Sequence, residues 1–173
     1  LANGDYGAVL QGLPEPLRSQ LLFGLFKVNA VDNPYQTIPT AWLQAAVDRW
    51  KKAERPDVGL SSIGVDVARG GDDKTVLAPR YGVWFDVLVK VPGKQTPTGA
   101  DVAQLVVPRM TTTAAINVDV IGVGSSAFDH LPFPNVNGVN FGAGTDLTDK
   151  SKLLGFANVR AAAYWLLREA LDP

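Results

Sequence analysis

Two aspartates occupy the middle of hydrophobic runs that have the alternating pattern of β-strands. Asp66 lies in SSIGVDVA, between Val65 and Val67, and Asp119 lies in INVDVIG. Because successive side chains of a strand point to opposite faces, Asp66 shares its face with a glycine and an alanine rather than with the valines. A charge in such a position is costly unless it is paired or bound to a metal. Small neighbours also leave room for a ligand.

Two carboxylates on neighbouring strands would open on the same side of a sheet and could share a divalent cation. Carboxylate oxygens prefer hard cations such as Mg²⁺ or Mn²⁺. Hydrolysis of a phosphodiester by two such metals, about 4 Å apart, needs acidic ligands and neither histidine nor cysteine. Asp66 and Asp119 are therefore the candidate catalytic and metal-binding residues. The alternative is that Asp66 pairs with a lysine such as Lys74 and that Asp119 is a strand-end residue facing water.

The segment GGDDKTV, residues 70–76, follows the first aspartate and has the composition of a hairpin turn. We favour the turn as the role of its acids, with Asp73 rather than Asp72 as a secondary site candidate. Lys74, or Arg69 before the turn, could face a phosphate. No G-x-x-x-x-G-K-[ST] motif occurs in the chain, so the sequence contains no complete nucleotide-driven motor.

A second glycine-rich segment, GVGSSA at residues 122–127, formally matches the dinucleotide-binding pattern G-x-G-x-x-A. The helix expected after it is too short for a dinucleotide-binding domain. Gly122 and Gly124 are better explained as positions where the backbone approaches Asp119. Ser125 is predicted to cap the following helix, whose N-terminus favours a phosphate.

The remaining polar candidates have ordinary structural interpretations. His130 is the only histidine, and we expect it to be a partly buried structural residue. Asn158 and Arg160, in FANVRAAAYWLLREALDP, could meet a phosphate or a neighbouring acid, although a solvated helix face is the default. The apolar side of the same amphipathic segment is expected to face the core through Phe156, Ala163, Leu166 or Leu167, and Leu171.

The composition is that of a folded protein without a strong electrostatic field. Hydrophobic residues make up 46% and charged residues 19% of the 173 residues, which is outside the range typical of disorder. The formal net charge of −1 means that any contact with nucleic acid must be local. The absence of cysteine excludes disulfides, thiolate zinc sites and cysteine nucleophiles. With no apolar run long enough for a membrane span and no signal sequence at the N-terminus, we expect a cytoplasmic protein and no membrane partner.

The chain divides into a helical part, residues 1–57, and a strand-rich part, residues 58–173. The first part is predicted to contain two short helices within 6–26, a helix over 41–50 with Thr40 as its N-cap, and a charged, solvated linker. The second part is predicted to contain strands at 61–68, 74–82, 83–91, 116–122 and 135–141. Its predicted helices cover residues 98–110, 125–131 and 149–171.

This order, β-β-β-α-β-α-β-α, is that of the ribonuclease H-like architecture. The fold class is α/β, with a three-strand antiparallel meander, parallel strands added to the same sheet and flanking helices. The first and fourth strands lie side by side at the centre of such a sheet. They are the two strands that carry Asp66 and Asp119.

Five segments, in this order, resemble the large terminase subunit of tailed bacteriophages and prophages. They are LPEPLRSQLLFGLF, IPTAWLQAAVDRW, IGVDVARGGDDKTVLAPRYG, VDVIGVGSSAFDHL and GFANVRAAAYWLLREALDP. The resemblance extends over essentially the whole chain. It implies that residues 1–57 correspond to the end of a packaging ATPase domain and its connector, and that residues 58–173 correspond to a ribonuclease H-like nuclease.

The resemblance also implies a function and a set of partners. The family cuts concatemeric double-stranded DNA during genome packaging with Mg²⁺ or Mn²⁺, and Asp66 and Asp119 match its first two metal-binding acids. The small terminase subunit, the portal protein and a ring oligomer belong to the intact packaging motor. The third family acid is expected beyond Pro173, and Ala162 stands where the family has a glutamate. We therefore expect weak or absent cleavage by this chain.

Two other functions fit parts of the sequence. A non-catalytic docking or DNA-guiding module of the packaging motor would need no metal at Asp66. An actin-like ATPase shares the fold and an acid-glycine first hairpin, but it requires a second phosphate loop that the sequence lacks.

Overall fold

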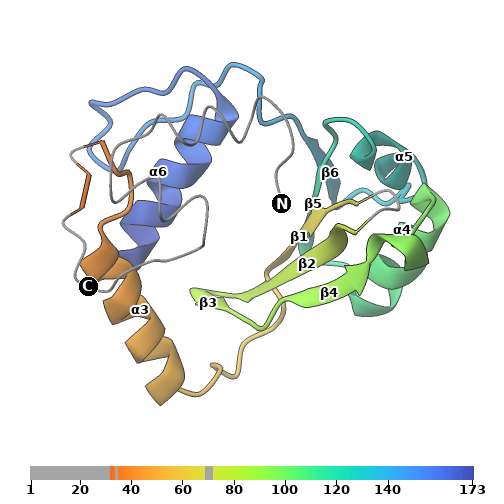
Figure 1. Ribbon diagram of the computed structural model, residues 1–173, viewed down its shortest axis with the longest axis horizontal. Helices are drawn as coiled ribbons and strands as arrows, with labels where there is room; N and C mark the ends of the chain where they lie inside the picture. The colour runs from red at the N-terminus through yellow and green to blue at the C-terminus, as the bar shows by residue number, and fades with distance from the viewer. Residues whose placement is uncertain (1–31, 34, 69–71) are drawn as a thin grey trace.

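The centre of the protein is a mixed β-sheet. The computed structural model describes residues 32–33, 35–68 and 72–173 (Figure 1). The strands of this part of the chain, all in one sheet, are β1 (Ser62–Asp66), β2 (Lys74–Tyr81), β3 (Trp84–Phe85), β4 (Val89–Pro92), β5 (Ala115–Asp119) and β6 (Val136–Val139). The predicted helices within residues 6–26 lie outside the described residues.

The sheet has ribonuclease H-like topology. Its order is β3-β2-β1-β5-β6, and β4 also pairs with β2. Strand β1 runs antiparallel to β2 and parallel to β5, which in turn runs parallel to β6. The predicted fold class is therefore confirmed, including the central pair formed by the first predicted strand and the strand of Asp119.

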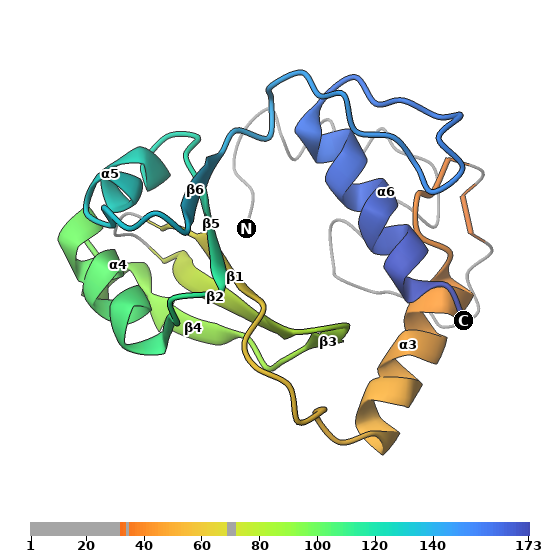
Figure 2. The ribbon, with the colours of Figure 1, turned by 180° about the vertical axis from the view of Figure 1, so that it is seen from behind.

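One face of the sheet is covered by α4 (Gly99–Val106) and α5 (Gly124–Asp129), which lie together at the same end of the molecule (Figures 1 and 2). A capping box begins α4, in which Thr98 Oγ1 accepts from Asp101 N–H and the Asp101 carboxylate accepts from Thr98 N–H at 3.0 Å. The close approach of the two helices requires Gly99, where a methyl group would overlap the carbonyl of Ser126. The core beneath them contains Ile63, Val65, Leu77, Val102, Val106, Ile116, Val118, Ala127 and Leu131.

Two longer helices, α3 (Thr40–Lys52) and α6 (Val159–Leu171), lie apart from the α4–α5 layer, and the C-terminal end of α6 meets the first part of α3 (Figures 1 and 2). The guanidinium of Arg168 lies over the rings of both Trp42 and Trp165, at 4.9 and 4.4 Å from their centroids. The expectation that Leu166 or Leu167 faces the core is wrong, because they are 39% and 37% exposed. Helix α6 packs on α3 through Arg168 and the tryptophans, and it does not pack on the sheet through its leucines. This explains why the leucines are exposed.

Helix α3 is attached to the sheet through the β2–β3 hairpin. Trp50 stacks on Trp84 with ring centroids 5.6 Å apart, and Trp50 Nε1 donates to the carbonyl of Phe85 at 2.9 Å. The Arg55 guanidinium lies 4.4 Å from the centroid of the Tyr81 ring. These contacts hold the segment between α3 and β1 against the end of the hairpin that lies far from Asp66.

Two predicted elements differ clearly from the structure in their bounds. The expected strand over 83–91 is divided into β3 and β4, because Asp86 accepts from its neighbour Val87 N–H at 2.8 Å and pairs with Arg55 at 3.5 Å. The long helix expected from residue 149 begins only at Val159. Before it, Asp149 accepts from the backbone N–H groups of Leu153 and Leu154, which holds residues 149–154 in a loop.

Thr40 is the first residue of α3 and not its N-cap. Pro39 occupies the cap position and makes no side-chain hydrogen bond. The Asp32 carboxylate instead accepts from Thr40 N–H at 2.9 Å, so a distant residue satisfies the helix start. Hydrogen bonds from the side chain and backbone of Thr40 lower the pKa of Asp32 below its usual value.

None of the helices in the described part of the chain has the length and apolar character needed to cross a membrane.

Candidate functional site

Asp66 and Asp119 are the last residues of two adjacent parallel strands, β1 and β5. The register pairs Val65 with Val118, so the next step along both strands brings the two aspartates beside each other. Neighbouring strands are about 4.8 Å apart. Since Val65 and Val118 are buried under α4 and α5, both aspartates lie on the opposite, open face of the sheet. The structure thus brings together the two residues predicted to bind metal.

The two carboxylates have different surroundings. Asp66 is exposed, whereas Asp119 is partly buried and accepts a hydrogen bond from Ile121 N–H at 2.9 Å through Oδ1. The ion pairs found among the described residues include neither of them. In particular, the alternative pairing of Asp66 with Lys74 is not formed, although both side chains lie on the open face. One carboxylate is therefore held in place by the backbone and the other faces solvent.

The turn after Asp119 depends on its two glycines. Gly122 has φ +71°, a left-handed conformation that residues with a side chain rarely adopt. Gly124 packs directly on the backbone of Asp119, since a methyl group there would overlap the Asp119 carbonyl oxygen. This agrees with the predicted steric role of the glycines. The predicted capping role of Ser125 is wrong: Val123 is at the cap position, and Ser125 Oγ donates back to the carbonyl of Gly122 at 3.0 Å.

A buried threonine pair anchors the chain just after Asp66, and the sequence analysis missed it. The backbone N–H of Ala68 donates to Thr75 Oγ1 at 3.2 Å. Thr75 Oγ1 also lies 3.3 Å from the carbonyl oxygen of Ala68 and 2.7 Å from Thr96 Oγ1. Both threonines are buried, at 0% and 3% exposure. The only hint in the sequence was that Thr75 falls on the core face of the predicted second strand. The pair fixes the exit of β1 and hence the backbone that carries Asp66.

The two carboxylates fit one hard divalent cation better than two. Mg²⁺ keeps several waters and is usually held by one or two carboxylates together with substrate phosphates. Asp66 is exposed, and neither the Asp66 carboxylate nor Asp119 Oδ2 makes a hydrogen bond to the described residues. Within residues 32–33, 35–68 and 72–173, no group of three or more histidine, cysteine, aspartate or glutamate residues is placed to hold a metal. The donor set formed by the two carboxylates is of the kind that Mg²⁺ or Mn²⁺ prefers.

The secondary candidates are distributed over the molecule. Asp73 is exposed, and its carbonyl accepts from Gly93 N–H at 2.8 Å, while its neighbour Asp72 pairs with Lys94 at 3.4 Å, as suits a turn. Lys74 begins β2 on the open face, one strand away from Asp66. Asp73 therefore has a backbone role, and Lys74 is a charged secondary candidate on the same face of the sheet as the carboxylates.

The candidates on α6 and α5 have local roles. Asn158 is the N-cap of α6 and accepts from Ala161 N–H at 2.9 Å, and Arg160 is exposed. Both line a shallow cavity of about 420 Å³ with Phe156, Tyr164 and Trp165, away from the aspartates. His130 is exposed rather than partly buried, and its Nδ1 lies 2.8 Å from the carbonyl of Ser126, one turn earlier in the chain.

A cavity of about 360 Å³ lies beside the strand ends, on the helix side of the sheet. Its walls come from the exit of β1, the start of α4 and the glycine turn, including Ala68, Thr96, Gly99, Gly122 and Ser126. Its polar groups already bond to one another through Thr96 and the α4 capping box. It is therefore packing space around the aspartate-bearing turns.

A scan of the chain against protein-family models and a search of curated proteins find no match.

Proposed function

We propose that this protein is a metal-dependent endonuclease acting on double-stranded DNA, of the kind that large terminase subunits use to cut concatemeric DNA during packaging. The observation that carries the proposal is the pairing of Asp66 and Asp119 at the ends of adjacent parallel strands, on a face that no described helix covers. The resemblance of five ordered segments to that family supports the same activity. It also supports action in the host cytoplasm together with a small terminase subunit and a portal protein.

Asp66 and Asp119 would hold Mg²⁺ or Mn²⁺ between them, with Asp119 kept in orientation by the N–H of Ile121. The bound cation supplies charge neutralisation at a DNA phosphate and lowers the pKa of a water that can attack it. The exposed side chain of Asp66 leaves the approach to that phosphate open. Gly122 and Gly124 hold the Asp119 turn, and Thr75 holds the exit of β1.

A two-carboxylate site predicts slow cleavage. Two-metal hydrolysis uses one cation for the attacking water and another for the leaving oxygen, and the described residues offer ligands for one. We expect cleavage to be stronger with Mn²⁺ than with Mg²⁺, because Mn²⁺ binds a given oxygen site at least as tightly and is less demanding in geometry.

Conversion of supercoiled plasmid to nicked and linear forms in Mn²⁺ tests the proposal. The comparison set is the unaltered chain, Asp66→Asn, Asp119→Asn and, as a control, Asp129→Asn, which changes an exposed acid at the end of α5. The proposal predicts that cleavage by the first two variants falls at least tenfold and that the control is unaffected. Undiminished cleavage in both site variants would rule the assignment out.

The shortage of acids favours a second candidate, a non-catalytic DNA-guiding module of the same packaging machine. Such a module needs no cation at Asp66. The absence of any metal-dependent cleavage, together with retained DNA binding and no Mn²⁺ binding, would select it over the nuclease.

A further inference from the structure

The open face of the sheet is polar, and the cations that the described residues place on it lie on one side of the aspartate pair. Lys74, Arg80 and Lys90 project from β2 and β4 on the face of Asp66, because Val76 pairs with both Asp66 and Lys90 and because Lys74 and Arg80 lie an even number of residues from Val76. The residues that alternate with them, Thr75, Leu77 and Val89, face the core. On the other side of the pair, β6 contributes the amide of Asn137, which donates to Asn117 Oδ1 at 3.3 Å, and no charge.

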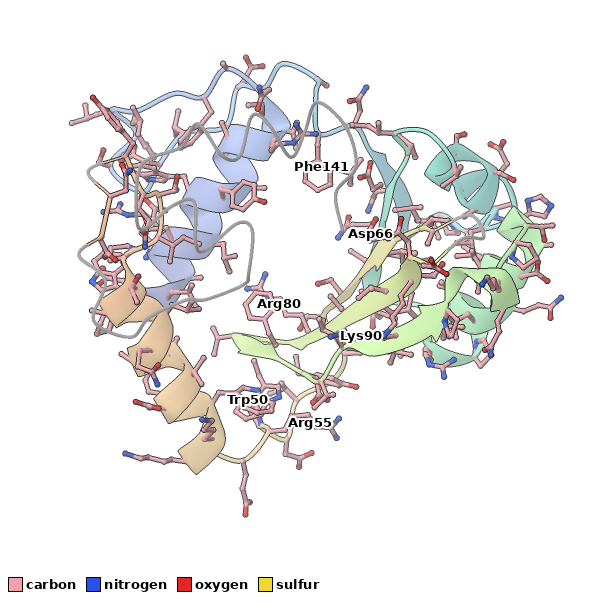
Figure 3. The ribbon with its side chains drawn as sticks, viewed as in Figure 1. Trp50, Arg55, Asp66, Arg80, Lys90 and Phe141 are labelled. Atoms are coloured by element: carbon pink, nitrogen blue, oxygen red, sulfur yellow. The ribbon has the colours of Figure 1, made fainter. Side chains whose placement is uncertain are left out.

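The register gives the spacing of these cations from the site. Val76 pairs with Asp66 on one side and with Lys90 on the other, so Lys90 lies two strands, roughly 10 Å, from Asp66. Arg80 lies four residues beyond Val76 along β2, which is a distance of roughly 13 Å, and it pairs with Phe85 in β3. Figure 3 shows Arg80 and Asp66 on the same side of the sheet, with Trp50 and Arg55 on the other.

These side chains are exposed and lack acidic partners among the described residues. The ion pairs found there join Arg55 to Asp86 and Lys94 to Asp72, and they include none of the three cations. Arg80 makes one hydrogen bond, from Nε to the carbonyl of Gly82 at 2.7 Å, and its guanidinium lies 5.3 Å from the centroid of the Phe85 ring. The other N–H groups of this guanidinium have no hydrogen-bond acceptor among the described residues.

We infer that the phosphate backbone of duplex DNA lies over β2 and β4, held by Lys74, Lys90 and Arg80, on its way to the carboxylates. The inference rests on the proposed function and adds the path of the substrate and the residues that position it. Charge complementarity selects DNA as the occupant. The three cations have no acidic partner in the part of the chain that the structure describes, although the chain as a whole has no net positive charge, and an apolar protein partner would meet few apolar side chains here. Lys74, Lys90 and Arg80 are positioning residues, and they touch no reacting atom.

Fluorescence anisotropy of a labelled duplex, in EDTA so that no cleavage occurs, tests this directly. Each phosphate contact contributes about 0.9 to the slope of log affinity against log salt concentration. Lys74→Gln, Arg80→Gln and Lys90→Gln should each weaken binding several-fold and lower that slope by about one. Lys51→Gln, an exposed lysine of α3, is the matched control and should leave both quantities unchanged.

Unchanged affinity and slope in all three open-face variants would overturn the inference, as would an equal loss in the Lys51 control. A change in sedimentation with unaltered DNA affinity would assign the face to a second copy of the chain and overturn it as well. Binding in EDTA is independent of the metal site, so cleavage by Asp66→Asn reports separately on the proposed function. Thermal melting of each variant is the control for folding, and because all the substituted positions are exposed, each variant should melt at the temperature of the unaltered chain.

Discussion

The Cα of Gly124 lies directly against the carbonyl oxygen of Asp119, with no space for a side chain between them. This contact folds the start of α5 back onto the end of β5, so the turn between them stays tight and the Asp119 carboxylate stays at the strand end. The glycine is a positioning residue for the acid although it carries no functional group.

Gly124→Ala should destabilise the protein by about 3 kcal/mol or more, because backbone must move to admit the methyl group. Chemical denaturation monitored by tryptophan fluorescence measures the change. Gly59→Ala is the control, since Gly59 has open space around it, and it should change stability by less than about 0.5 kcal/mol. Equal stability of the two variants would show that the turn can relax around Gly124.

Thr75→Val should cost about 1 to 3 kcal/mol of stability, although the two side chains are nearly the same size. The change removes the hydroxyl that meets both backbone groups of Ala68 and Thr96 Oγ1 in a buried setting, which leaves those groups unpaired. Urea denaturation checks this, with Thr112→Val at an exposed position as the control. A Thr75→Val protein as stable as the parent would mean that the network does not anchor β1.

The loop around Asp149 should lose its structure in acid. The Ser151 hydroxyl, and then the backbone N–H groups of Leu154 and Leu153, hold the pKa of Asp149 below its usual value of 3.8. Because the pKa of Asp149 is lower in the folded loop than in the unfolded chain, the carboxylate stabilises the loop at any pH above the unfolded-state pKa. This stabilisation is lost as the pH falls through the folded-state pKa.

NMR titration of the Leu153 and Leu154 amide signals checks this expectation. The signals should be constant at pH 5 and above and should shift below about pH 4. Asp149→Asn should remove the pH dependence. Persistence of the full transition in that variant would assign it to another group.

The sequence predicted the sheet and the aspartate pair because both depend on short-range patterns. Alternation around Asp66 and Asp119 defined their faces, and the order of elements made their strands neighbours. The break between β3 and β4 depends on Arg55, which reaches Asp86 from another part of the chain. The start of α3 similarly depends on Asp32, and no local pattern indicates such contacts.

The leucines of α6 illustrate a different limit. Their helical spacing indicated a core-facing stripe, and Leu166 and Leu167 are exposed because the helix packs on α3 through Arg168, which lies over Trp42. Amphipathic spacing predicts that a helix has two faces. The spacing does not predict which element of the protein covers the apolar face. In α6 the partner is set by cation–π contacts, which leave no periodic pattern in the sequence.

Calorimetric titration with Mn²⁺ tests the central claim, that Asp66 and Asp119 together hold a divalent cation. The unaltered chain and the Asp129→Asn control should bind one Mn²⁺ with the same affinity, while Asp66→Asn and Asp119→Asn should each weaken binding at least tenfold. Because the two carboxylates act on one ion, the double variant should bind little more weakly than either single one. Mn²⁺ binding that is unchanged by both single substitutions would contradict the claim.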